Sequence, residues 1–381
     1  MSEKLFVSGD EAVALAVRQA KPHVIAAYPI TPQTIVVERL SDFVEDGSLN
    51  SQYMYVESEH SAMCACLGAS AIGARTFTAT SSQGLLYMVE GLHYASGSRF
   101  PIVMMNANRS IAAPWNIYGD QRDSLAELES GWIQLYAENA QEAYDTILEA
   151  YKVAEDPDVM LPVMVNLDGF VLTHTYELLH TVDQDKVDAY IPYQQFANRM
   201  DLDNPKATCI TAGPLYNMEF RYQQHQAMLN AVEKIKAADK AFGETFGRSY
   251  GGDPDHPRQR GRYDPLRGRR AARAGQEGRP AEDPLHASVP GQGNRGGREE
   301  CEVRGRSGEG RELRLRGRCV YGRSALKSAG VEIPAANYVG GLGGRSIYKT
   351  DIEKIYEELL AGTAKVGEAN FVNLRRDICG A

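Results

Sequence analysis

Residues 55–84, YVESEHSAMCACLGASAIGARTFTATSSQG, hold the pattern that decides the fold. A strand that ends near Glu59 is followed by a helix to about residue 73, and then by the β-rich run ARTFTATSS. The helix is built almost entirely from Ala, Ser, Gly and Cys, with Glu59 and His60 at its head. We expect such a small-residue surface to allow close approach to the acid.

The same alternation of strand and helix extends over residues 1–175. Apolar or β-branched runs predict strands, and the amphipathic or small-residue runs between them predict helices. Ser8 and Asp10 are candidates to cap the first helix. The alternation implies an α/β fold with a parallel sheet covered on both faces. The predicted strands are 22–30, 52–58, 74–82, 100–108 and 161–168, and the predicted helices are 8–20, 31–46, 59–73, 83–98 and 140–155.

The bulk composition is that of an ordinary, mildly acidic protein. The chain has 381 residues, a net charge of −9 and 43% hydrophobic residues, and a domain typically takes roughly 100–200 residues, so two domains are expected. The charge balance argues against general nucleic-acid binding, and no apolar run approaches the ~20 residues that span a bilayer. The N-terminus lacks a basic segment followed by an apolar one, so we expect no signal peptide and a cytoplasmic protein.

Several common kinds of site are not supported by the sequence. The six cysteines are scattered with no C-x-x-C pair, which disfavours both a disulfide framework and an iron–sulfur cluster held by this chain alone. No phosphate-binding loop, His-rich metal spacing or G-x-S-x-G elbow is present, and GGLGGR at 340–345 lacks the dinucleotide-binding spacing. We therefore predict no metal ligands on this chain.

Residues 176–247 form the second predicted part of the chain. Residues 176–216 are polar and read as an irregular linker wrapped over the surface, and residues 220–247 read as a helix. An apolar stripe on that helix predicts core or subunit interface. It consists of Met228, Val232, Ile235, Phe242 and Phe246.

Residues 248–381 form the third predicted part, and 251–320 break its pattern. This stretch has sixteen Arg and fourteen Gly but no Lys, Ile, Phe, Met or Trp. A disordered basic linker and an RGG-like RNA-binding segment are two interpretations. The third, which we favour, is a frameshift, because shifting the back-translated codons by one nucleotide admits an ordinary strand–turn–helix sequence. Ordinary α/β texture returns near residue 320, with a helix at 325–330, a strand at 333–341 and a helix from near Thr350.

Three places combine polar residues with a predicted strand end. Thr31 lies between two prolines, Glu59 follows the strand at 52–58, and Arg109 follows the strand at 100–108. Ligands bind at the carboxyl ends of strands in open parallel sheets, and an Arg fork suits a substrate carboxylate. Each place also has a structural interpretation: a helix cap for Thr31, a solvated helix start for Glu59 and an ion-pair partner for Arg109.

Seven sequence blocks in order carry a family resemblance. They are YPITPQT, ESEHSA, GARTFTATSSQG, NANRSIAAPWNI, SGWIQLYAEN, PVMVNLDGFVLTH and NYVGGLGGR. Together they resemble the α subunit of the pyruvate:ferredoxin oxidoreductases, members of the 2-oxoacid:ferredoxin oxidoreductase family that use thiamine diphosphate. The resemblance covers roughly residues 5–250 and 320–365, and within 251–320 the shifted reading is closer to the family than the printed one.

The resemblance implies a fold and a set of site residues. The first domain would be of the pyrimidine-binding thiamine diphosphate type, followed by a smaller transketolase-C-terminal-like α/β domain disrupted at about 251–320. Glu59 matches the carboxylate that hydrogen-bonds the aminopyrimidine ring, and Thr31 and Arg109 match the residues that hold the carboxylate of the 2-oxoacid. Ser82 and Gln83 would line the pyrimidine cleft. The small residues that would leave room for the cofactor are Ala62, Cys64, Cys66 and Gly68, and His60 would cap or pack.

The resemblance also implies partners, because this chain carries no recognisable segment for the diphosphate or for iron–sulfur clusters. A β subunit would supply Mg²⁺ and the diphosphate site, and γ and δ subunits the remaining electron path and the coenzyme A contacts. The implied reaction is oxidative decarboxylation of pyruvate to acetyl-CoA with electrons passed to ferredoxin. A branched-chain 2-oxoacid or 2-oxoglutarate is the alternative substrate. An RNA-binding protein that uses the Arg/Gly tract is the alternative of another class.

Overall fold

The computed structural model describes residues 3–205, 207–208, 211–212, 217–250, 286–290, 300–304, 337–339, 348–363 and 369–372. The chain forms two compact units, Met1–Gly252 and Asp253–Ala381. The finer division predicted above, at residues 175/176 and 247/248, stays a prediction. Each unit is described by itself below.

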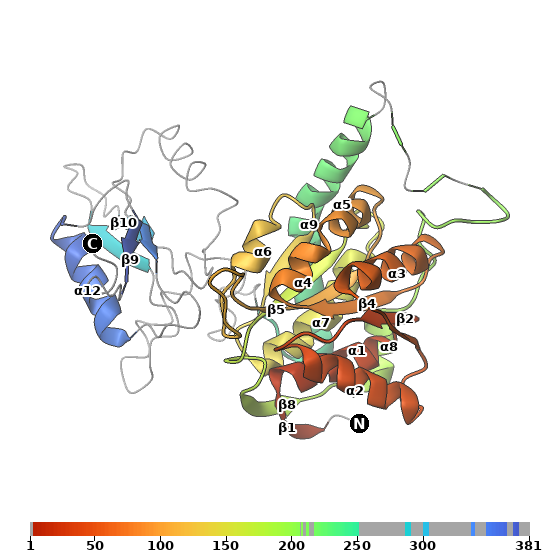
Figure 1. Ribbon diagram of the computed structural model, residues 1–381, viewed down its shortest axis with the longest axis horizontal. Coiled ribbons are helices and arrows are strands. Elements are labelled where there is room, and N and C mark those ends of the chain that lie inside the picture. Colours follow the sequence, from red (N-terminus) through yellow and green to blue (C-terminus); the bar gives the residue numbers. More distant parts are fainter. Residues whose placement is uncertain are drawn as a thin grey trace. The chain divides into compact units, whose positions relative to one another are not determined.

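A six-stranded parallel sheet forms the centre of the first unit, with the strand order β3-β2-β4-β5-β7-β6 (Figure 1). The sheet confirms the predicted parallel α/β fold, and β6 is a strand that the sequence did not predict. Its strands are β2 (Val24–Ala27), β3 (Gln52–Tyr55), β4 (Thr76–Thr80), β5 (Val103–Asn108), β6 (Ile133–Tyr136) and β7 (Val163–Asp168).

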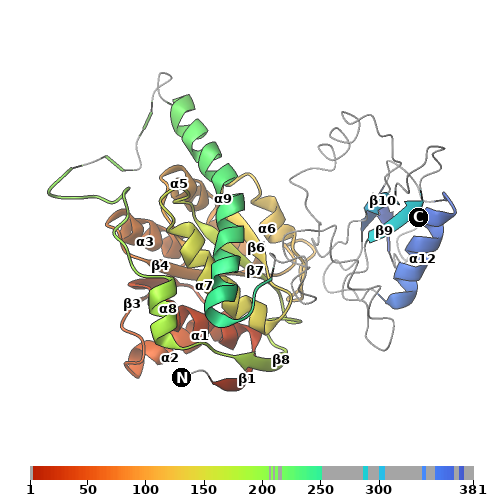
Figure 2. The ribbon, with the colours of Figure 1, turned by 180° about the vertical axis from the view of Figure 1, so that it is seen from behind.

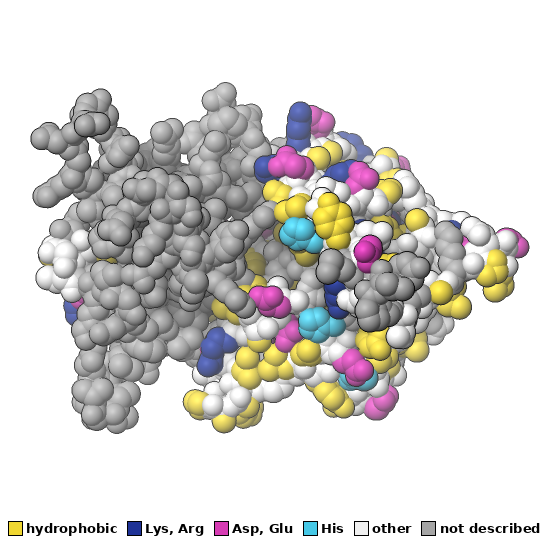
Figure 3. Space-filling view, turned by 90° about the horizontal axis from the view of Figure 1, so that it is seen from above, with side chains coloured by type: hydrophobic (Ala, Val, Ile, Leu, Met, Phe, Trp, Pro, Cys, Tyr) yellow, Lys and Arg dark blue, Asp and Glu magenta, His cyan; other side chains and the backbone are white. Residues whose placement is uncertain are grey.

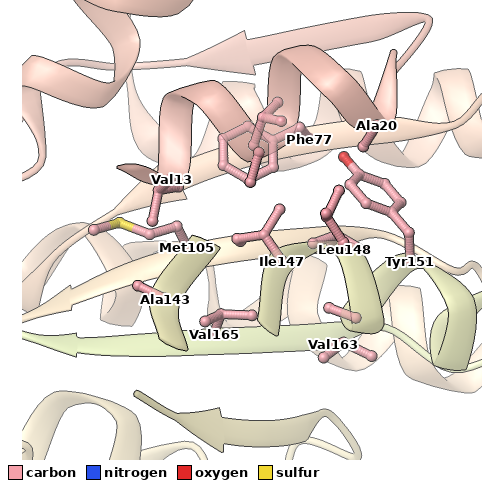
Figure 4. Packing of buried hydrophobic residues seen from close by; sticks show 14 of the residues in the cluster. Val13, Ala20, Phe77, Met105, Ala143, Ile147, Leu148, Tyr151, Val163 and Val165 are labelled. Atoms are coloured by element: carbon pink, nitrogen blue, oxygen red, sulfur yellow. The ribbon is translucent and has the colours of Figure 1, made fainter. Parts of the chain in front are cut away.

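Helices cover both faces of this sheet, as the buried strands require. One face packs against α1 (Gly9–Ala20), α2 (Thr34–Glu45) and α7 (Ala140–Ala154), and the other against α3 (Glu59–Ala71), α4 (Ser82–Tyr87) and α5 (Val89–Gly97). Figure 4 shows the first of these cores, where Ile147 and Tyr151 of α7 meet Phe77 of β4 and Val163 of β7. The strand residues that face the second core include Met104 of β5 and Met164 of β7.

The local sequence fixes the residue at which α1 begins. The hydroxyl of Ser8 accepts a hydrogen bond from the backbone N–H of Glu11 at 3.3 Å, and the Glu11 carboxylate accepts one from the backbone N–H of Ser8 at 3.0 Å. This reciprocal arrangement is a capping box, which satisfies donors left free at a helix start. Ser8 is therefore the cap, as predicted for one of the two candidates.

Three segments differ from the predicted elements. Residues 176–216 are not irregular throughout, because β8 (Tyr176–His180) pairs antiparallel with β1 (Lys4–Ser8), and α8 (Gln184–Tyr190) follows. The helix predicted at 83–98 is divided into α4 and α5 at Met88. A further short helix, α6 (Arg122–Ala126), lies in a stretch for which the sequence predicted no element. Such short elements carry too few periodic residues for a pattern to reveal them.

The long helix α9 (Asn217–Phe246) packs along α7 and α8 (Figure 2). Phe242 is fully buried and Met228, Ile235 and Phe246 pack against the core, as predicted for the stripe, whereas Val232 is 38% exposed and does not join the core. Small residues on the same face let the helices approach closely. These small residues are Ala227, Ala231 and Ala238.

Residues 248–250, near the end of the first unit, are hydrogen-bonded to Asp145 of α7. Asp145 is fully buried, and its carboxylate accepts hydrogen bonds from Arg248 Nε and Nη2, both at 2.7 Å, and from the hydroxyl of Tyr250 at 2.5 Å. Burial raises the pKa of Asp145, and its bonds to Arg248 oppose that shift. Residues 248–250 are thus tied to the helical layer of the first unit.

The second unit is described only in part. β11 (Asn337–Val339) pairs parallel with β12 (Ala369–Phe371), and Tyr338 packs against Ile355 of α12 (Lys349–Leu360). These elements agree with the strand predicted at 333–341 and the helix predicted from near Thr350. β9 (His286–Pro290) and β10 (Glu300–Arg304) pair antiparallel. The helix predicted at 325–330 and most of 251–320 lie outside the described residues, so the frameshift stays a prediction.

The surface of the described part of the chain is chemically mixed. Figure 3 shows hydrophobic, acidic and basic side chains interspersed over the face of the first unit that is seen from above. Among the described helices, none is both long and apolar enough to cross a membrane.

Candidate active site

The central sheet has a topological switch point between β2 and β4. The chain leaves β2 through α2 toward the edge strand β3, whereas it leaves β4 through α4 and α5 toward β5 on the other side. Neighbouring strands whose connections diverge leave a crevice at their carboxyl ends, and ligands of open α/β sheets bind there. Thr31 follows β2, and Ser82 and Gln83 follow β4. These three residues therefore flank the crevice.

Glu59 reaches the crevice from the first turn of α3. The hydroxyl of Ser58 caps this helix by accepting a hydrogen bond from the backbone N–H of Ser61 at 3.2 Å. The helix then packs across β2 and β4, which brings its first residue back toward the switch point although it follows the edge strand. The Glu59 side chain is buried, and the N-terminus of a helix favours a carboxylate.

Gly84 of α4 makes room for this carboxylate. A Cβ atom at position 84 would lie 2.6 Å from Glu59 Oε1 and 2.5 Å from the hydroxyl oxygen of Thr80. Both distances are shorter than carbon–oxygen contacts allow, so only glycine fits while Glu59 keeps its position. The glycine in the motif TATSSQG is therefore explained by the acid twenty-five residues earlier in the sequence.

The variant Gly84→Ala should displace the Glu59 carboxylate without unfolding the domain. For the reaction that the family resemblance implies, we expect a loss of cofactor-dependent turnover of about 100-fold, because a misplacement near 1 Å in an active site has that effect. Gly68→Ala is the matched control, since a Cβ there meets nothing within 4 Å and Ala is the better helix former by about 1 kcal/mol. Turnover assays with parallel thermal unfolding would check both. Full activity in Gly84→Ala would contradict the assigned contact.

Arg109 lies across the crevice and joins its two sides. Its Nη1 donates to the backbone oxygen of Thr31 at 2.6 Å, and its Nη2 donates to Gln83 Oε1 at 3.2 Å. The guanidinium also lies 5.4 Å from the ring centre of Trp115. Burial lowers the pKa of Arg109, while the charges of Asp123 and Glu59 raise it. Arg109 is thus held between both loops and within electrostatic reach of Glu59.

Ser82 and Gln83 form the opposite wall of the crevice. The Ser82 hydroxyl lies 2.6 Å from Gln83 Oε1 and 2.7 Å from the backbone oxygen of Ser110. Ser82 has a φ of 49°, in the left-handed region that non-glycine residues seldom adopt. Such backbone conformations cluster at functional sites.

Comparison with known proteins decides the family. Residues 15–240 match the family described as "Pyruvate flavodoxin/ferredoxin oxidoreductase, thiamine diP-bdg". The chain belongs to this family. Its first unit is therefore a thiamine diphosphate-binding domain of the oxidoreductase type, and this confirms the resemblance and the fold predicted for that domain from the sequence.

Curated relatives of this oxidoreductase domain carry two kinds of name. The pyruvate synthase subunit PorA of Methanothermobacter thermautotrophicus is 51% identical over 245 residues, which cover 64% of this chain and 64% of the relative. The ketoisovalerate oxidoreductase subunit VorA of Pyrococcus horikoshii is 50% identical over 248 residues, covering 65% and 62%. The matched part thus spans less than two thirds of these relatives. All are named as subunits, so relatives of this domain work in multi-subunit oxidoreductases.

A solved structure shares the fold of this chain. The 2-oxoglutarate:ferredoxin oxidoreductase from Magnetococcus marinus superposes with a TM-score of 0.57 at 15% identity, over 93% of this chain and 64% of that one. At this level of identity the similarity concerns the fold alone.

The residues around the crevice fit a bound cofactor. Three buried polar atoms beside the crevice have no hydrogen-bond partner among the described residues: Gln83 Nε2, Arg109 Nε and the hydroxyl oxygen of Thr80. Buried polar atoms are nearly always hydrogen-bonded in folded proteins, so each unpaired atom needs an explanation. A polar ligand in the crevice supplies one. Within the described part of the chain, no cluster of three or more His, Cys, Asp or Glu side chains could hold a metal ion.

The structure gathers the five predicted site residues, excludes the capping interpretation of Thr31 and agrees with the packing role expected for His60. Thr31 does not cap α2, because the residue in the cap position is Gln33. His60 lies outside the crevice, with Nε2 3.5 Å from Glu90 and Nδ1 3.7 Å from Cys64.

The small residues of α3 do not line the site as expected. Ala62 and Cys66 are buried in the core against the sheet, and Cys66 Sγ lies 3.6 Å from the backbone oxygen of Phe77. Cys64 and Gly68 are exposed. The small side chains therefore bring α3 close to β2 and β4, and only its first residue faces the crevice.

Sequence reasoning missed the polar residues beneath the site. Asn106 and Asn108 on β5 and Asp123 on α6 are fully buried, and both asparagine amides donate to the Asp123 carboxylate. A signal was present, because two asparagines interrupt the apolar run VMMNAN at alternate positions. Alternate residues of a strand share one face, so these amides needed a common buried partner.

Proposed function

We propose that this chain is the α subunit of a thiamine diphosphate-dependent 2-oxoacid:ferredoxin oxidoreductase with pyruvate as its substrate. The reaction is oxidative decarboxylation of pyruvate with coenzyme A, giving acetyl-CoA and CO₂, with the electrons passed to ferredoxin. The observation that carries the proposal is the convergence of Glu59 and Arg109 on one crevice of a thiamine diphosphate-binding domain.

Each residue of the crevice has a separate task in this proposal. Glu59 holds a proton at its carboxyl group against the N1′ atom of the aminopyrimidine ring. Gln83 and Ser82 line the same ring with amide and hydroxyl groups. Arg109 and Thr31 bind the carboxylate of the 2-oxoacid. Bound thiamine diphosphate supplies the nucleophilic carbon and the electron sink that decarboxylation needs.

The geometry of Arg109 suits a carboxylate that is later lost. Each terminal nitrogen carries two hydrogens, so Nη1 and Nη2 can donate one each to the protein and one each to a substrate. The contacts to Thr31 and Gln83 fix the plane of the guanidinium before the substrate arrives. Because the carboxylate leaves as CO₂, Arg109 must orient it without over-stabilising the ground state.

The rest of the machinery is assigned to partner subunits of a cytoplasmic complex. A β subunit would hold Mg²⁺ and the diphosphate, so the cofactor would lie at an α–β interface. The γ and δ subunits would carry the further electron path and coenzyme A contacts, with iron–sulfur clusters on the partner subunits. The subunit names of the relatives support a multi-subunit complex, and the division of tasks among its subunits is part of the proposal.

A branched-chain 2-oxoacid is the second candidate substrate. The relative named as a ketoisovalerate oxidoreductase subunit is as similar to this chain as the relatives named for pyruvate. Ferredoxin reduction by the assembled complex with pyruvate, 2-oxoisovalerate and 2-oxoglutarate would decide. Reduction that depends on thiamine diphosphate and is fastest with pyruvate is expected. No reduction with any 2-oxoacid would refute the proposed function.

Arg109→Leu should mainly weaken use of the 2-oxoacid. Loss of a charged hydrogen-bonding partner is worth about 1.5–3 kcal/mol, so the KM for the 2-oxoacid should rise about 10- to 100-fold. Affinity for the cofactor should change little. The control is Arg39→Leu, which removes an exposed ion pair with Glu11 far from the crevice. Unchanged kinetics in Arg109→Leu would assign this side chain to structure.

A further inference from the structure

A single buried carboxylate lies beneath both walls of the crevice. Asp123 Oδ2 accepts hydrogen bonds from the backbone N–H groups of Ser82 at 2.9 Å and Arg109 at 3.2 Å. Its Oδ1 accepts from Asn108 Nδ2 at 2.8 Å and from the backbone N–H of Ser124 at 2.7 Å. Asp123 is 0% exposed, so it cannot touch a substrate. It can act only through the residues it holds.

The bond to Ser82 maintains an unfavourable backbone conformation. With a φ of 49°, Ser82 is in the left-handed region that costs energy for a residue with a Cβ. The Asp123 carboxylate receives the Ser82 N–H in this conformation, and the Ser82 hydroxyl is then aimed at Gln83 and Ser110. Without that acceptor, the loop after β4 would relax and Gln83 would move with it.

The bond to Arg109 fixes the start of the second loop. Arg109 is the first residue after β5, and its backbone N–H points down to Asp123 while its side chain extends across the crevice. The same oxygen atom therefore sets the spacing between the loop that carries Gln83 and the loop that carries Arg109. The hydrogen bond between these two side chains, at 3.2 Å, depends on that spacing.

We propose that Asp123 is a positioning residue that joins the loops after β4 and β5 and thereby places Arg109 and Gln83 for the 2-oxoacid. This inference rests on the proposed function for its kinetic consequence but not for its structural one. An amide cannot replace the carboxylate, because Oδ2 receives the N–H groups of both loops and Oδ1 receives the N–H of Ser124, whereas Asn offers a single acceptor oxygen. In Asp123→Asn the NH2 group must face either both loop N–H groups or the N–H of Ser124. The substitution should therefore release both loops or detach them from α6, and in either case their placement loosens.

The pKa of Asp123 predicts that its contacts with the two loops depend on pH. Burial raises its pKa to about 6, while its hydrogen bonds from Asn108, Ser124, Ser82 and Arg109 oppose the shift. The charged groups that face it are Arg109 and Arg122, since α4 (SQGLLY) and β5 (VMMNAN) bring no charged side chain. Below about pH 6 a proton on the carboxyl group removes an acceptor, and the loops should loosen.

Trp115 offers a reporter that needs neither cofactor nor substrate. Its ring lies 5.4 Å from the Arg109 guanidinium and it is exposed, whereas the chain's other tryptophan, Trp132, is buried. The fluorescence of the full chain should show a step near pH 6 that vanishes in both Trp115→Phe and Asp123→Asn. Burial lowers the pKa of His174, whose ring stacks on Phe170, so the step must also survive His174→Gln, which removes that second titrating group.

The second experiment measures the KM for the 2-oxoacid in the assembled complex, with a matched control variant. Asp123→Asn should raise the KM for the 2-oxoacid on the order of 10-fold, and should add little to Arg109→Leu, because both act on one contact. Asp120→Asn is the control, since Asp120 is equally buried in the same segment but pairs with Arg122, and it should leave this KM unchanged.

Each combination of results is decisive. Loss of the fluorescence step together with the higher KM supports the inference. Loss of the step with an unchanged KM also supports the positioning of Arg109, and counts against the substrate role in the proposed function. The inference is overturned, whatever the activity, if Asp123→Asn shows the same fluorescence step near pH 6 and the same Trp115 emission as the unsubstituted chain.

Discussion

Glu59→Gln, assembled with its partner subunits, is expected to lose about 100- to 10,000-fold of its thiamine diphosphate-dependent turnover. That range is the usual contribution of a positioned acid or base. Gln has nearly the same shape as Glu, so it should keep the close packing against Gly84. It cannot hold a proton for the aminopyrimidine ring in the way a carboxyl group does. The loss should therefore fall on turnover and only slightly on cofactor affinity.

A nearby glutamate provides the control for this substitution. Glu57 is exposed two residues earlier and bonds to the hydroxyl of Ser61. Glu57→Gln should retain the turnover of the unsubstituted complex. Steady-state ferredoxin reduction and calorimetric titration with thiamine diphosphate would separate catalysis from binding. Near-normal turnover in Glu59→Gln would remove Glu59 from its assigned role.

The sequence was sufficient to predict the parallel sheet, except for its edge strand β6, and the residues that follow its strands. Strand runs such as VMMNAN and VMVNLD are apolar enough to require burial on both faces, and parallel strands place everything that follows them at one edge. Thr31, Glu59 and Arg109 each follow a strand, so their proximity was foreseeable. The order of the strands in the sheet could not be predicted, because local sequence patterns do not indicate which strands pair with each other.

The supporting residues were harder to foresee, for a physical reason. Asp123 lies in a helix of five residues, and Gly84 in a helix of six, both too short for periodicity to appear. Their roles depend on contacts between segments far apart in sequence: Gly84 with Glu59, and Asp123 with Ser82. The small residues of α3 indicated that something packs closely against this helix, and we expected the cofactor there. In the structure it is mainly the sheet that packs against them.

Two arginines that look alike in sequence differ in structure. Arg75 and Arg109 are both buried beside strands of the central sheet. Arg75 binds the Glu155 carboxylate through Nε and Nη2, both at 2.6 Å, and donates Nη1 to the backbone oxygen of Ala20 at 2.8 Å. Arg109 makes no hydrogen bond to a carboxylate among the described residues, and its Nε is unpaired. The satisfied arginine is structural, and the unsatisfied one is available to a ligand.

Arg75→Met should therefore lower the free energy of unfolding by about 3–5 kcal/mol, because it leaves Glu155 buried without its counter-charge. Burial raises the pKa of Glu155, and Arg75 opposes that rise. In the variant the folded-state pKa lies further above the unfolded value, so the folded chain keeps a proton that the unfolded chain releases. Stability of the variant must then fall as pH rises above about 4.3, and the loss should be larger at pH 8 than at pH 5.

Urea unfolding of the full chain at both pH values would measure this loss. Arg75→Met combined with Glu155→Gln should recover part of the stability, since the second change removes the buried charge while keeping the side chain's volume. Because Arg75 ties Ala20 and Ile191 to the amino end of β4, opposite the crevice, the folded fraction should keep the KM of the unsubstituted enzyme. A loss below 1 kcal/mol, or one that shrinks from pH 5 to pH 8, would show that Glu155 finds another partner when Arg75 is gone.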